Sequence, residues 1–553
     1  MLQFIQAAEL AIILAVTLAL AWPLSIHITR IFKNTPSRLD RILKPIENTI
    51  FRLTGVDPSQ GMGWKEYFLA ALFLNIIQMA IAFFILMFQG ALPLNPQGFP
   101  GFTWDLAFNT VVSFATNTNL QHYAGEQSLS IFSQMTAIQF LQFTSATTGI
   151  CAGIAMVRAF VVKAKDMGNF YADFVRSLTR LFLPLCFIAA LISVWLGSPQ
   201  TLNAYKLVTT IQGANQKILF GPVASLVSVM QLGTNGGGFY GANSAYPFQN
   251  PNPASDVFQI LLMLLIPTAL CFVFGEFIGK RKESLPIIVG AYSLFVIDVA
   301  IAYIPNIVSV GPGLETRFGG FMSTFWTVVT TAVTTGSVNA SLAGINPLGI
   351  VAAFMGMLIQ STPGGKGVGL MYLLMYVVIT VFIVGLMSGR TPEYLGLKIT
   401  GRDVKLVMVA FLIHPLAIII PTVVAYASGA VNAIGLNGSS LSFTQIFYEF
   451  TTSAANNGSD FLGTTANTPF FNVATALVIF VGRYGPMVCL LALAGSMIGR
   501  KRASSEAALK TDTWSFSFIL VASILILVVL TFFPFLALGP LLAYFQGFHN
   551  FFG

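Results

Sequence analysis

Charged residues are scarce in this sequence. Asp, Glu, Lys and Arg together make up 9% of its 553 residues, whereas 55% are hydrophobic and the mean hydropathy is +0.78. A soluble globular protein carries about 25% charged residues, so the composition excludes that class and predicts a protein that spans a membrane many times. The net charge of +8 does not indicate a nucleic-acid partner, because the positions of the basic residues follow a membrane topology.

Cysteine and histidine are also scarce, with four of each. The cysteines all lie within apolar runs without the spacing of metal ligands, which predicts packed thiols and not disulfides. The histidines are scattered along the chain and predict no ligand or catalytic set: they are His27, His122, His414 and His549. A polytopic membrane enzyme would need a polar catalytic cluster, and the apolar spans supply none.

Long hydrophobic runs dominate the chain. About 20 apolar residues span a bilayer as a helix. By this measure the sequence predicts ten spans, at about residues 5–28, 65–90, 128–157, 177–197, 257–278, 285–305, 348–387, 405–427, 471–498 and 514–545. The first run lacks the basic segment of a signal peptide, so we expect it to remain as a membrane anchor.

The basic residues set the orientation of these spans. Of 28 Lys and Arg residues, 23 fall in five alternate connections, at about residues 30–65, 158–180, 280–282, 390–405 and 500–510. Cytoplasmic loops carry the excess of Lys and Arg. The alternation therefore predicts that both chain termini lie outside the cytoplasm.

Four short polar loops share one sequence pattern. They occupy residues 115–121, 233–239, 333–339 and 455–460. Each follows an apolar stretch of ten to twelve residues, too short to cross a bilayer: Trp104 to Phe114, Pro222 to Leu232, Phe321 to Ala332 and Phe443 to Thr452. Such a stretch beside a full span predicts a re-entrant half-helix, and an irregular loop at membrane depth is tolerated where it lines a watery cavity.

We therefore predict an all-α membrane protein with ten transmembrane helices. A unit of span, half-helix, filter loop and span is repeated four times, with one extra helix at each end. The segments are 1–62 (first helix and cytoplasmic loop), 63–165, 166–282, 283–400 and 401–502 (the four repeats), and 503–553 (last helix).

The polar loops carry neutral oxygens in a common arrangement. Set in one column, Thr118, Gly236, Gly336 and Gly458 coincide, and each is preceded by two Thr or Asn residues. A cation leaving water needs oxygens in place of its hydration shell; backbone carbonyls supply them without fixed charge, and glycine permits the dihedral angles that aim them. Ordinary turns between helices are the alternative, but four aligned copies on one side favour a filter.

We predict a potassium-selective filter. Its residues are Thr116, Asn117, Thr118, Asn119, Thr234, Asn235, Gly236, Gly237, Thr334, Thr335, Gly336, Asn456, Asn457 and Gly458. None of them is Asp or Glu, which argues against a calcium or magnesium site. Five acidic residues flank the loops and are expected to raise the cation concentration at the mouth: Asp105, Glu126, Glu315, Glu449 and Asp460.

Several long strings resemble one protein family. They are Leu53-Thr54-Gly55-Val56-Asp57-Pro58, Pro93-Leu94-Asn95-Pro96-Gln97-Gly98, Thr116-Asn117-Thr118-Asn119, Gly233-Thr234-Asn235-Gly236-Gly237-Gly238-Phe239, Gly389-Arg390-Thr391-Pro392-Glu393-Tyr394-Leu395-Gly396 and Ala455-Asn456-Asn457-Gly458-Ser459. They are similar to the potassium-binding subunits of the Kdp potassium-transporting ATPase, the KdpA family, and the likeness covers nearly the whole chain. The wider superfamily includes the Trk and Ktr potassium transporters.

The resemblance implies a division of labour. A P-type ATPase subunit, KdpB, would bind and hydrolyse ATP, and KdpC and the small KdpF would complete a complex in a bacterial inner membrane. Potassium would be the transported ion, with no organic cofactor in this chain, which lacks an Asp-Lys-Thr-Gly-Thr phosphorylation motif. A self-sufficient Trk/Ktr-type channel is the alternative; a gene neighbour encoding a P-type ATPase would separate the two.

The seventh predicted span contains a break. Pro363 and nearby glycines interrupt a long apolar stretch, and the resemblance implies that this loop, with Gln360, Gly364, Gly365 and Lys366, is a gate below the filter. The family typically has Glu where Gln360 stands and no lysine in the run. A phosphate-binding loop is excluded, because Gly367 stands where Ser or Thr is required.

Two further cations are candidates for function. Lys366 and Arg483 lie at membrane depth, and we expect them to face the cavity below the filter and to repel potassium; snorkelling or local pairing is the alternative for Lys366. Arg390 lies in a cytoplasmic connection and is a candidate for contact with a partner subunit, although a capped loop explains it equally well.

Overall fold

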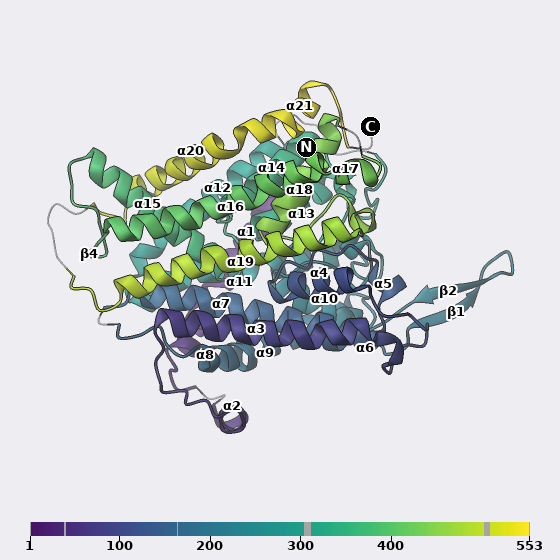
Figure 1. Cartoon of the computed structure of the whole chain (residues 1–553), viewed down its shortest axis with the longest axis horizontal. Coiled ribbons are helices and arrows are strands. Elements are labelled where there is room, and N and C mark those ends of the chain that lie inside the picture. The colour runs from purple at the N-terminus through teal and green to yellow at the C-terminus, as the bar shows by residue number, and fades with distance from the viewer. Residues whose placement is uncertain are drawn as a thin grey trace.

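The computed structural model of the chain describes residues 2–37, 40–162, 164–303, 311–436, 438–502 and 509–551. Within these residues, ten helices are long and apolar enough to span a membrane, and most run in roughly the same direction (Figure 1). The only strands in the described part form two short antiparallel pairs. The predicted class, an all-α membrane protein with ten spans, is confirmed. The predicted boundary at 502/503 adjoins residues 503–508, which lie outside the described residues.

The elements recur in one order four times: a long helix, a half-length helix, a polar loop and a second long helix. The first long helices are α3 (Trp64–Met87), the continuous helical run Phe170–Trp195 that ends in α9 (Leu183–Trp195), α12 (Ser284–Tyr303) and α16 (Gly401–Ala427). The half-length helices are α4 (Trp104–Ala115), α10 (Val223–Leu232), α13 (Gly319–Ala332) and α18 (Ser440–Ala454). The second long helices are α7 (Phe140–Arg158), α11 (Pro253–Ile278), α15 (Val368–Met387) and α19 (Pro469–Met497).

The half-length helices lie inside the bundle. Their bounds differ by at most three residues from the apolar stretches that the sequence singled out. Almost every residue in the last two turns of each helix is buried, including polar ones such as Asn109, Gln231, Thr330 and Thr451. A short helix with an apolar and small polar surface all round is typical of a helix buried on every side.

Two of the long helices contain a wider turn. Short helix α6 (Ile131–Ser133) continues through a π-helical segment, Gln134–Gln139, into α7, and α8 (Phe170–Ser177) continues through the π-helical segment Leu178–Phe182 into α9. Such segments are rare in helices and frequently adjoin functional sites.

The second long helix of the third repeat is in two pieces. Helix α14 (Pro347–Ile359) ends before the chain crosses, and α15 begins at Val368. Residues 360–367 connect them without helical structure. Gln360 ends α14 in the left-handed conformation, with φ of 56°.

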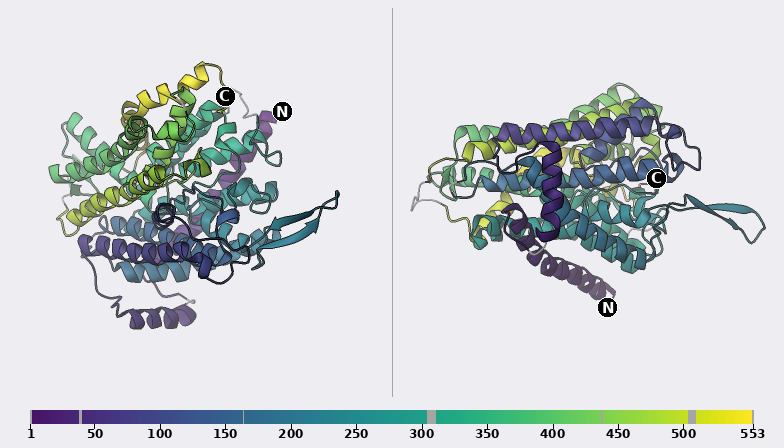
Figure 2. Two further views of the ribbon diagram at one scale, coloured as in Figure 1. Left: turned by 45° about the vertical axis from the view of Figure 1, so that its right-hand side comes forward. Right: turned by 90° about the horizontal axis from the view of Figure 1, so that it is seen from below.

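The remaining elements flank the repeats. Helix α1 (Leu2–Phe32) packs along α11, and α20 (Trp514–Leu538) packs against α12 and α15. Helix α2 (Asp40–Thr54) lies across the direction of the long helices (Figure 2). The short helices are α5 (Gly125–Ser128), α17 (Ala430–Ala433) and α21 (Pro540–Phe545), and the single-turn 3₁₀ helices are Gln89–Ala91, Asn243–Ala245, Arg281–Glu283, Leu342–Gly344 and Gly463–Ala466.

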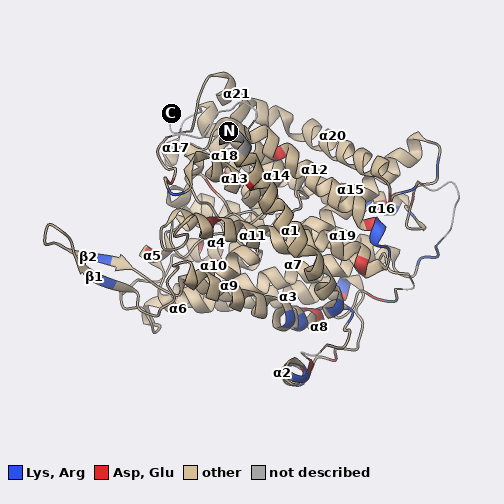
Figure 3. Cartoon of the chain, turned by 180° about the vertical axis from the view of Figure 1, so that it is seen from behind, with Lys and Arg blue, Asp and Glu red and all other residues tan. Residues whose placement is uncertain are grey.

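The two ends of the bundle differ in charge. Strands β1 (Tyr205–Thr209) and β2 (Asn215–Leu219) form a hairpin, in which Tyr205 pairs with Leu219, that extends away from one end (Figure 1). Most Lys and Arg residues gather at the opposite end, around α8, α16 and the start of α3 (Figure 3). A second, minimal pair, β3 (Glu393–Tyr394) and β4 (Leu397–Lys398), lies there between α15 and α16.

Candidate functional site

The four polar loops close into a ring by direct backbone contact. A first side-chain carbon placed on Gly236 would lie 1.9 Å from the carbonyl oxygen of Thr335, and one on Gly336 would lie 1.9 Å from that of Asn457. One on Gly458 would lie 1.8 Å from the carbonyl oxygen of Thr118. Loop 2 therefore touches loop 3, loop 3 touches loop 4, and loop 4 touches loop 1, at positions where only glycine fits.

Side-chain amides join loop 1 to loop 2. The Nδ2 atom of Asn117 donates to the carbonyl of Thr234 at 2.6 Å, and that of Asn119 donates to the carbonyl of Gly236 at 2.9 Å. In the opposite direction, Nδ2 of Asn235 donates to Oδ1 of Asn117 at 2.7 Å. These bonds complete the ring.

Fewer side-chain bonds cross the other three junctions. Gln231 donates to the Ser337 hydroxyl at 2.8 Å between repeats 2 and 3, and Asn457 donates to the Thr330 carbonyl at 2.9 Å between repeats 3 and 4. Asn456 donates to the Thr118 hydroxyl at 2.9 Å between repeats 4 and 1.

The structure corrects the register of the first loop. Asn119, Gly236, Gly336 and Gly458 have positive φ angles of 58°, 86°, 89° and 97°. In each loop, the residue before this one donates its backbone N–H to a carbonyl near the end of the preceding half-helix. These residues are Thr118, Asn235, Thr335 and Asn457. The glycine column is therefore completed by Asn119 and not by Thr118. The alignment by composition was wrong by one residue, because it ignored that Asn, too, adopts left-handed dihedrals.

Each loop alternates between positive and ordinary φ angles. Besides the glycine column, Asn117, Thr234, Thr334 and Asn456 also have positive φ, two residues earlier. A backbone that alternates in this way turns successive carbonyls toward the same side. The loops begin where the four half-helices end, so four helix C-termini, which carry partial negative charge, converge on the ring.

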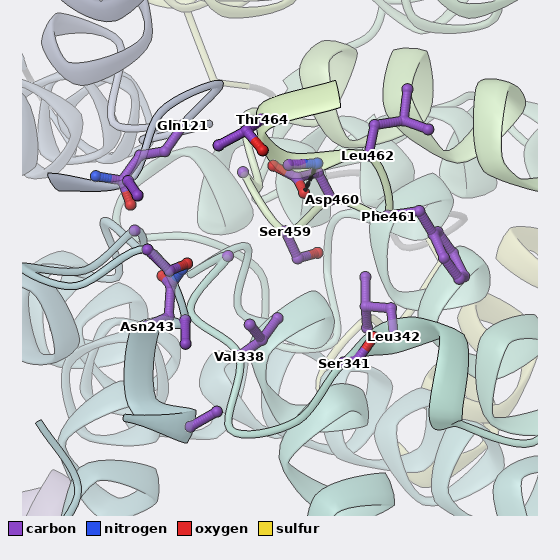
Figure 4. A pocket seen from close by; sticks show the side chains of 18 of the residues that line it. Gln121, Asn243, Val338, Ser341, Leu342, Ser459, Asp460, Phe461, Leu462 and Thr464 are labelled. Carbon is purple, nitrogen blue, oxygen red and sulfur yellow. Dashed lines mark hydrogen bonds between the residues drawn. The ribbon is translucent and has the colours of Figure 1, made fainter. Parts of the chain in front are cut away.

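A water-accessible pocket of about 540 Å³ opens above the ring. Its lining comes from all four repeats and includes Asn119, Gly237, Gly336 and Gly458 at its base; Figure 4 shows Gln121, Asn243, Ser341 and Asp460 around it. All predicted filter residues are buried from bulk solvent.

Only part of the predicted acidic mouth faces this pocket. Glu126, Glu315 and Asp460 line it. Burial, followed by the charge of Glu449, raises the pKa of Asp460, and burial raises the pKa of Glu126. Asp105 and Glu449 do not line the pocket: their carboxylates accept hydrogen bonds from Asn472 and His122 inside the protein. Contrary to expectation, these two side chains do not face the mouth: that of Asp105 is turned toward α19, and that of Glu449 toward His122 in the loop of the first repeat.

The connection between α14 and α15 lies directly against the ring on its other side. The N–H of Gly364 donates to the carbonyl of Ala332, the last residue of α13, at 2.9 Å. A side-chain carbon on Gly365 would lie 2.2 Å from the hydroxyl of Thr334. Gly367, with φ of 75°, packs on α7, where a side-chain carbon would lie 1.8 Å from the Gly149 carbonyl. The structure brings Gly364, Gly365 and Lys366 together beneath loops 2 and 3.

Lys366 and Arg483 approach each other beside α7. A side-chain carbon on Gly149 would lie 2.6 Å from the Lys366 carbonyl and 2.9 Å from the Arg483 guanidinium. The Lys366 ammonium lies 4.5 Å from the centre of the Phe182 ring and has no hydrogen-bond partner among the described residues. A cation over an aromatic face is attracted by the ring quadrupole.

The side chains of Gln360 and Arg390 point away from Lys366 and Arg483, although the Gln360 carbonyl lies against Gly364. The Gln360 amide, 3.0 Å from Nδ1 of His414, ties the end of α14 to α16. The backbone N–H of Arg390 bonds to the Gly385 carbonyl at the end of α15, and its side chain is exposed at the basic end of the bundle.

Sequence reasoning missed several polar side chains that support the ring. The Ser145 hydroxyl of α7 accepts a hydrogen bond from the Asn235 amide, which also donates to the backbone carbonyl of Gln142. His122 contacts Glu449 across 327 residues, and Asn472 links His122 to Asp105. Their scattered positions gave no motif. The available signal was their chemistry: amides and a histidine inside apolar runs need partners.

Comparison with known proteins places the chain in a family. A family model described as the potassium-transporting ATPase A subunit matches residues 11–545. Relatives named potassium-transporting ATPase potassium-binding subunit include one from Alicyclobacillus acidocaldarius, 44% identical over 551 residues, and one from Caldanaerobacter subterraneus, 42% identical over 555 residues. Each alignment covers 96% of this chain and 98% of the relative.

A solved structure shares the fold. The potassium transporter TrkH from Vibrio parahaemolyticus superposes with a TM-score of 0.52 at 16% identity, over 87% of this chain and 97% of its own. At this identity the likeness concerns the arrangement of helices alone. The family match and the relatives, which extend over nearly the full length, show that the chain belongs to the family of potassium-transporting ATPase A subunits.

Proposed function

We propose that this chain is the potassium-binding and potassium-translocating subunit of an ATP-driven uptake complex, and that the ring of four loops is its selectivity filter. One observation carries the proposal. At three of the four junctions between loops, a glycine backbone lies directly against a neighbouring loop's carbonyl, and at the fourth junction asparagine amides bond to the neighbouring loop. Such a ring offers closely spaced neutral oxygens at the convergence of four negative helix ends, which suits a monovalent cation.

The proposed filter residues fall into two groups. Thr118, Asn235, Thr335 and Asn457 anchor the loops, because their N–H groups bond back to the half-helices. The residues with positive φ around them aim the carbonyls: Asn117, Asn119, Thr234, Gly236, Gly237, Thr334, Gly336, Asn456 and Gly458. Thr116 adds a hydroxyl bond to the Val112 carbonyl that holds the end of α4.

Potassium would enter from the mouth pocket and leave sideways toward an ATPase subunit. Straight passage would be opposed by the loop at Gln360, Gly364, Gly365 and Lys366, whose backbone lies against the ring, and by the Arg483 guanidinium beside the Lys366 carbonyl. The partners in this proposal are KdpB, which would bind ATP, together with KdpC and KdpF. Exposed Arg390 is the candidate contact at the basic end.

The proposed location is the inner membrane of a bacterium, with the mouth pocket and both termini outside the cytoplasm. The asymmetry of charge supports this orientation, because the Lys- and Arg-rich end of the bundle lies opposite the hairpin β1–β2 (Figure 3). A self-sufficient Trk/Ktr-type channel is not favoured, because the relatives are named as subunits of an ATPase.

The filter assignment is tested by Gly336→Ala. The new methyl would overlap the Asn457 carbonyl, so we expect the apparent potassium affinity of the purified complex, measured by potassium-stimulated ATP hydrolysis, to fall by about tenfold or more. Gly435→Ala is the matched control, because Gly435 has a similar φ of 80° but no neighbour within 4 Å. Equal behaviour of the two variants would refute the filter.

The gate assignment is tested by Lys366→Ala and Arg483→Ala. Removal of either charge should raise passive potassium flux in proteoliposomes and should reduce the number of ions moved per ATP hydrolysed. Lys398→Ala, which removes an exposed lysine at the basic end, serves as the control. Unchanged flux and unchanged coupling in both variants would disprove the gate.

A further inference from the structure

A buried histidine and a buried glutamate connect the first and fourth repeats beside the ring. His122 lies three residues after Asn119, and Glu449 lies on α18, the half-helix of the fourth repeat. Nε2 of His122 is 3.0 Å from Oε1 of Glu449, and both side chains are fully buried. The second oxygen, Oε2 of Glu449, has no hydrogen-bond partner among the described residues. A buried carboxylate in this setting needs a partner that carries a proton.

The neighbouring hydrogen bonds determine where the protons lie. Nδ2 of Asn472 donates to Oδ2 of Asp105 at 2.8 Å and to Oδ1 of Asn467 at 2.9 Å, so Oδ1 of Asn472 faces His122 as an acceptor. Nδ1 of His122, 2.7 Å away, must then carry a proton. A second proton must occupy the contact between Nε2 and Oε1, because an imidazole lone pair and a carboxylate repel each other. The pair is neutral overall while it holds both protons.

The charged groups around His122 favour retention of this second proton. They are Glu449 from α18, Asp460 from the fourth loop and, through Asn472, Asp105 from α4. Burial alone would lower the pKa of His122, but the hydrogen bond to Glu449 and the negative charges of Glu449 and Asp460 outweigh it and raise the pKa above its ordinary value. The pair therefore keeps the second proton to a higher pH than an ordinary histidine would, and loses it as the pH rises further.

A second surface pocket adjoins the buried pair on the side of the mouth. Its volume is about 360 Å³, and its lining includes His122, Thr103 and Leu106 beside the start of α4. It shares Tyr123, Ala124 and Thr464 with the larger pocket above the ring, whose lining does not include His122. The opening beside the pair is therefore on the same side as the mouth, so the solution outside the membrane is the source of its proton.

We propose that His122 and Glu449 are positioning residues for the filter, and that their shared proton makes the discrimination between potassium and sodium depend on the pH outside the membrane. The inference deepens the proposed function and rests on it. The pair ties repeat 1 to repeat 4 at the junction where Gly458 meets the Thr118 carbonyl and Asn456 bonds to the Thr118 hydroxyl.

Loss of the shared proton lowers the selectivity for potassium over sodium in two ways. The imidazole lone pair then faces the carboxylate, so the tie between repeats 1 and 4 is lost and the spacing of the ring is less strictly held. One negative charge also remains near the mouth, which attracts any cation. Both effects lower selectivity as pH rises, and neither operates while the pair is protonated.

The experiment measures the ratio of apparent affinities for sodium-stimulated and potassium-stimulated ATP hydrolysis by the purified complex, from about pH 6 to about pH 9. A ratio cancels effects of pH on the ATPase subunit that are common to both ions. In the unmodified chain we expect selectivity to fall by about three- to tenfold across this range, the change that corresponds to one hydrogen bond.

Two variants separate a proton-dependent tie from a purely structural one. In Glu449→Gln the amide can donate to Nε2 of a neutral imidazole at any pH, so selectivity should be high and flat. In His122→Ala the tie is absent, so selectivity should be low and flat. His549→Ala removes an exposed histidine near the C-terminal end of the chain and should follow the unmodified chain.

Three results would overturn the inference while leaving the filter intact. They are a potassium preference that does not vary with pH, a Glu449→Gln variant that retains the original pH profile, and a His122→Ala variant with unaltered selectivity. Absence of any potassium preference in the unmodified chain would instead overturn the proposed function and the inference with it. Assembly of each variant into the complex, checked by size-exclusion chromatography, ensures that Glu449→Gln is compared in folded protein.

Discussion

Loop 1 and the other three loops reach the same ring by different means. Gly236, Gly336 and Gly458 have no side chain, and each presses its α-carbon against a neighbouring carbonyl. Asn119 stands in the same place with a full side chain and uses its amide to hold the Gly236 carbonyl. Three junctions are therefore closed by bare backbone, and the junction between repeats 1 and 2 is closed by hydrogen bonds. The difference predicts that the first three tolerate no added atom, whereas the fourth is sensitive to the chemistry of one group.

The largest effect on potassium affinity is expected where a side chain is added at a junction that is closed by glycine backbone. Gly458→Ala would drive a methyl group into the Thr118 carbonyl at a φ of 97°, so the ring must widen. Overpacking of this kind costs about 1–3 kcal/mol, and we expect apparent potassium affinity to fall by about 10- to 100-fold in the ATP hydrolysis assay. Gly429→Ala, at φ of 77° with open space around it, provides the control within the same repeat. A mild Gly458→Ala phenotype would show that the junction is not closed.

A smaller effect is expected where a side chain is removed from loop 1. Asn119→Ala keeps the first carbon but loses the bond to the Gly236 carbonyl, which should lower affinity by about two- to tenfold. Asn119→Gly loses the same bond but relieves the strain of a positive φ, so it should lower affinity equally and unfold at a higher temperature than Asn119→Ala. If Asn119→Gly instead matched the unmodified chain in affinity, the amide would have no role and the ring would work with four glycines.

The smallest effect on potassium affinity is expected one layer behind the ring. Gln231→Leu removes donors to the Ser337 hydroxyl and to Oε1 of Gln259, so repeats 2 and 3 lose a buried tie. The free energy of unfolding should fall by about 1–3 kcal/mol, read as a lower midpoint of thermal unfolding, while affinity changes less than in Asn119→Ala. Gln200→Leu, at an exposed side-chain bond to Ser225 in the same repeat, should leave the midpoint unchanged. If Gln231→Leu lost more potassium affinity than Gly458→Ala, the predicted order of effects would be wrong.

Hydropathy and length sufficed to predict the layout of the chain. A span must be apolar over its whole length, so its place in the sequence is visible without tertiary information. The half-helices were visible for the same reason: the bounds of α4 and α13 differ from the apolar stretches by no more than two residues, because each stretch stops where the polar loop starts.

The details of the site depend on properties that composition does not carry. Asn119 aligns with the three glycines because all four residues have a positive φ, a conformation that both Asn and Gly adopt. An alignment based on residue types placed Thr118 there instead. The contact of His122 with Glu449 joins residues 327 positions apart, and only the folded ring brings them together. Lys366 was predicted to face a cavity, which stays a prediction; the structure places its ammonium 4.5 Å from the centre of the Phe182 ring, a contact that composition could not reveal.

The contrast between Asn119 and the three glycines also decides how the protein can be re-engineered. Positions 236, 336 and 458 accept one residue type, so random libraries there would return mostly inactive clones. Position 119 already carries a side chain at the same level of the ring. Directed evolution toward rubidium, caesium or ammonium would therefore find at position 119 a variable site that the other three loops lack at this level.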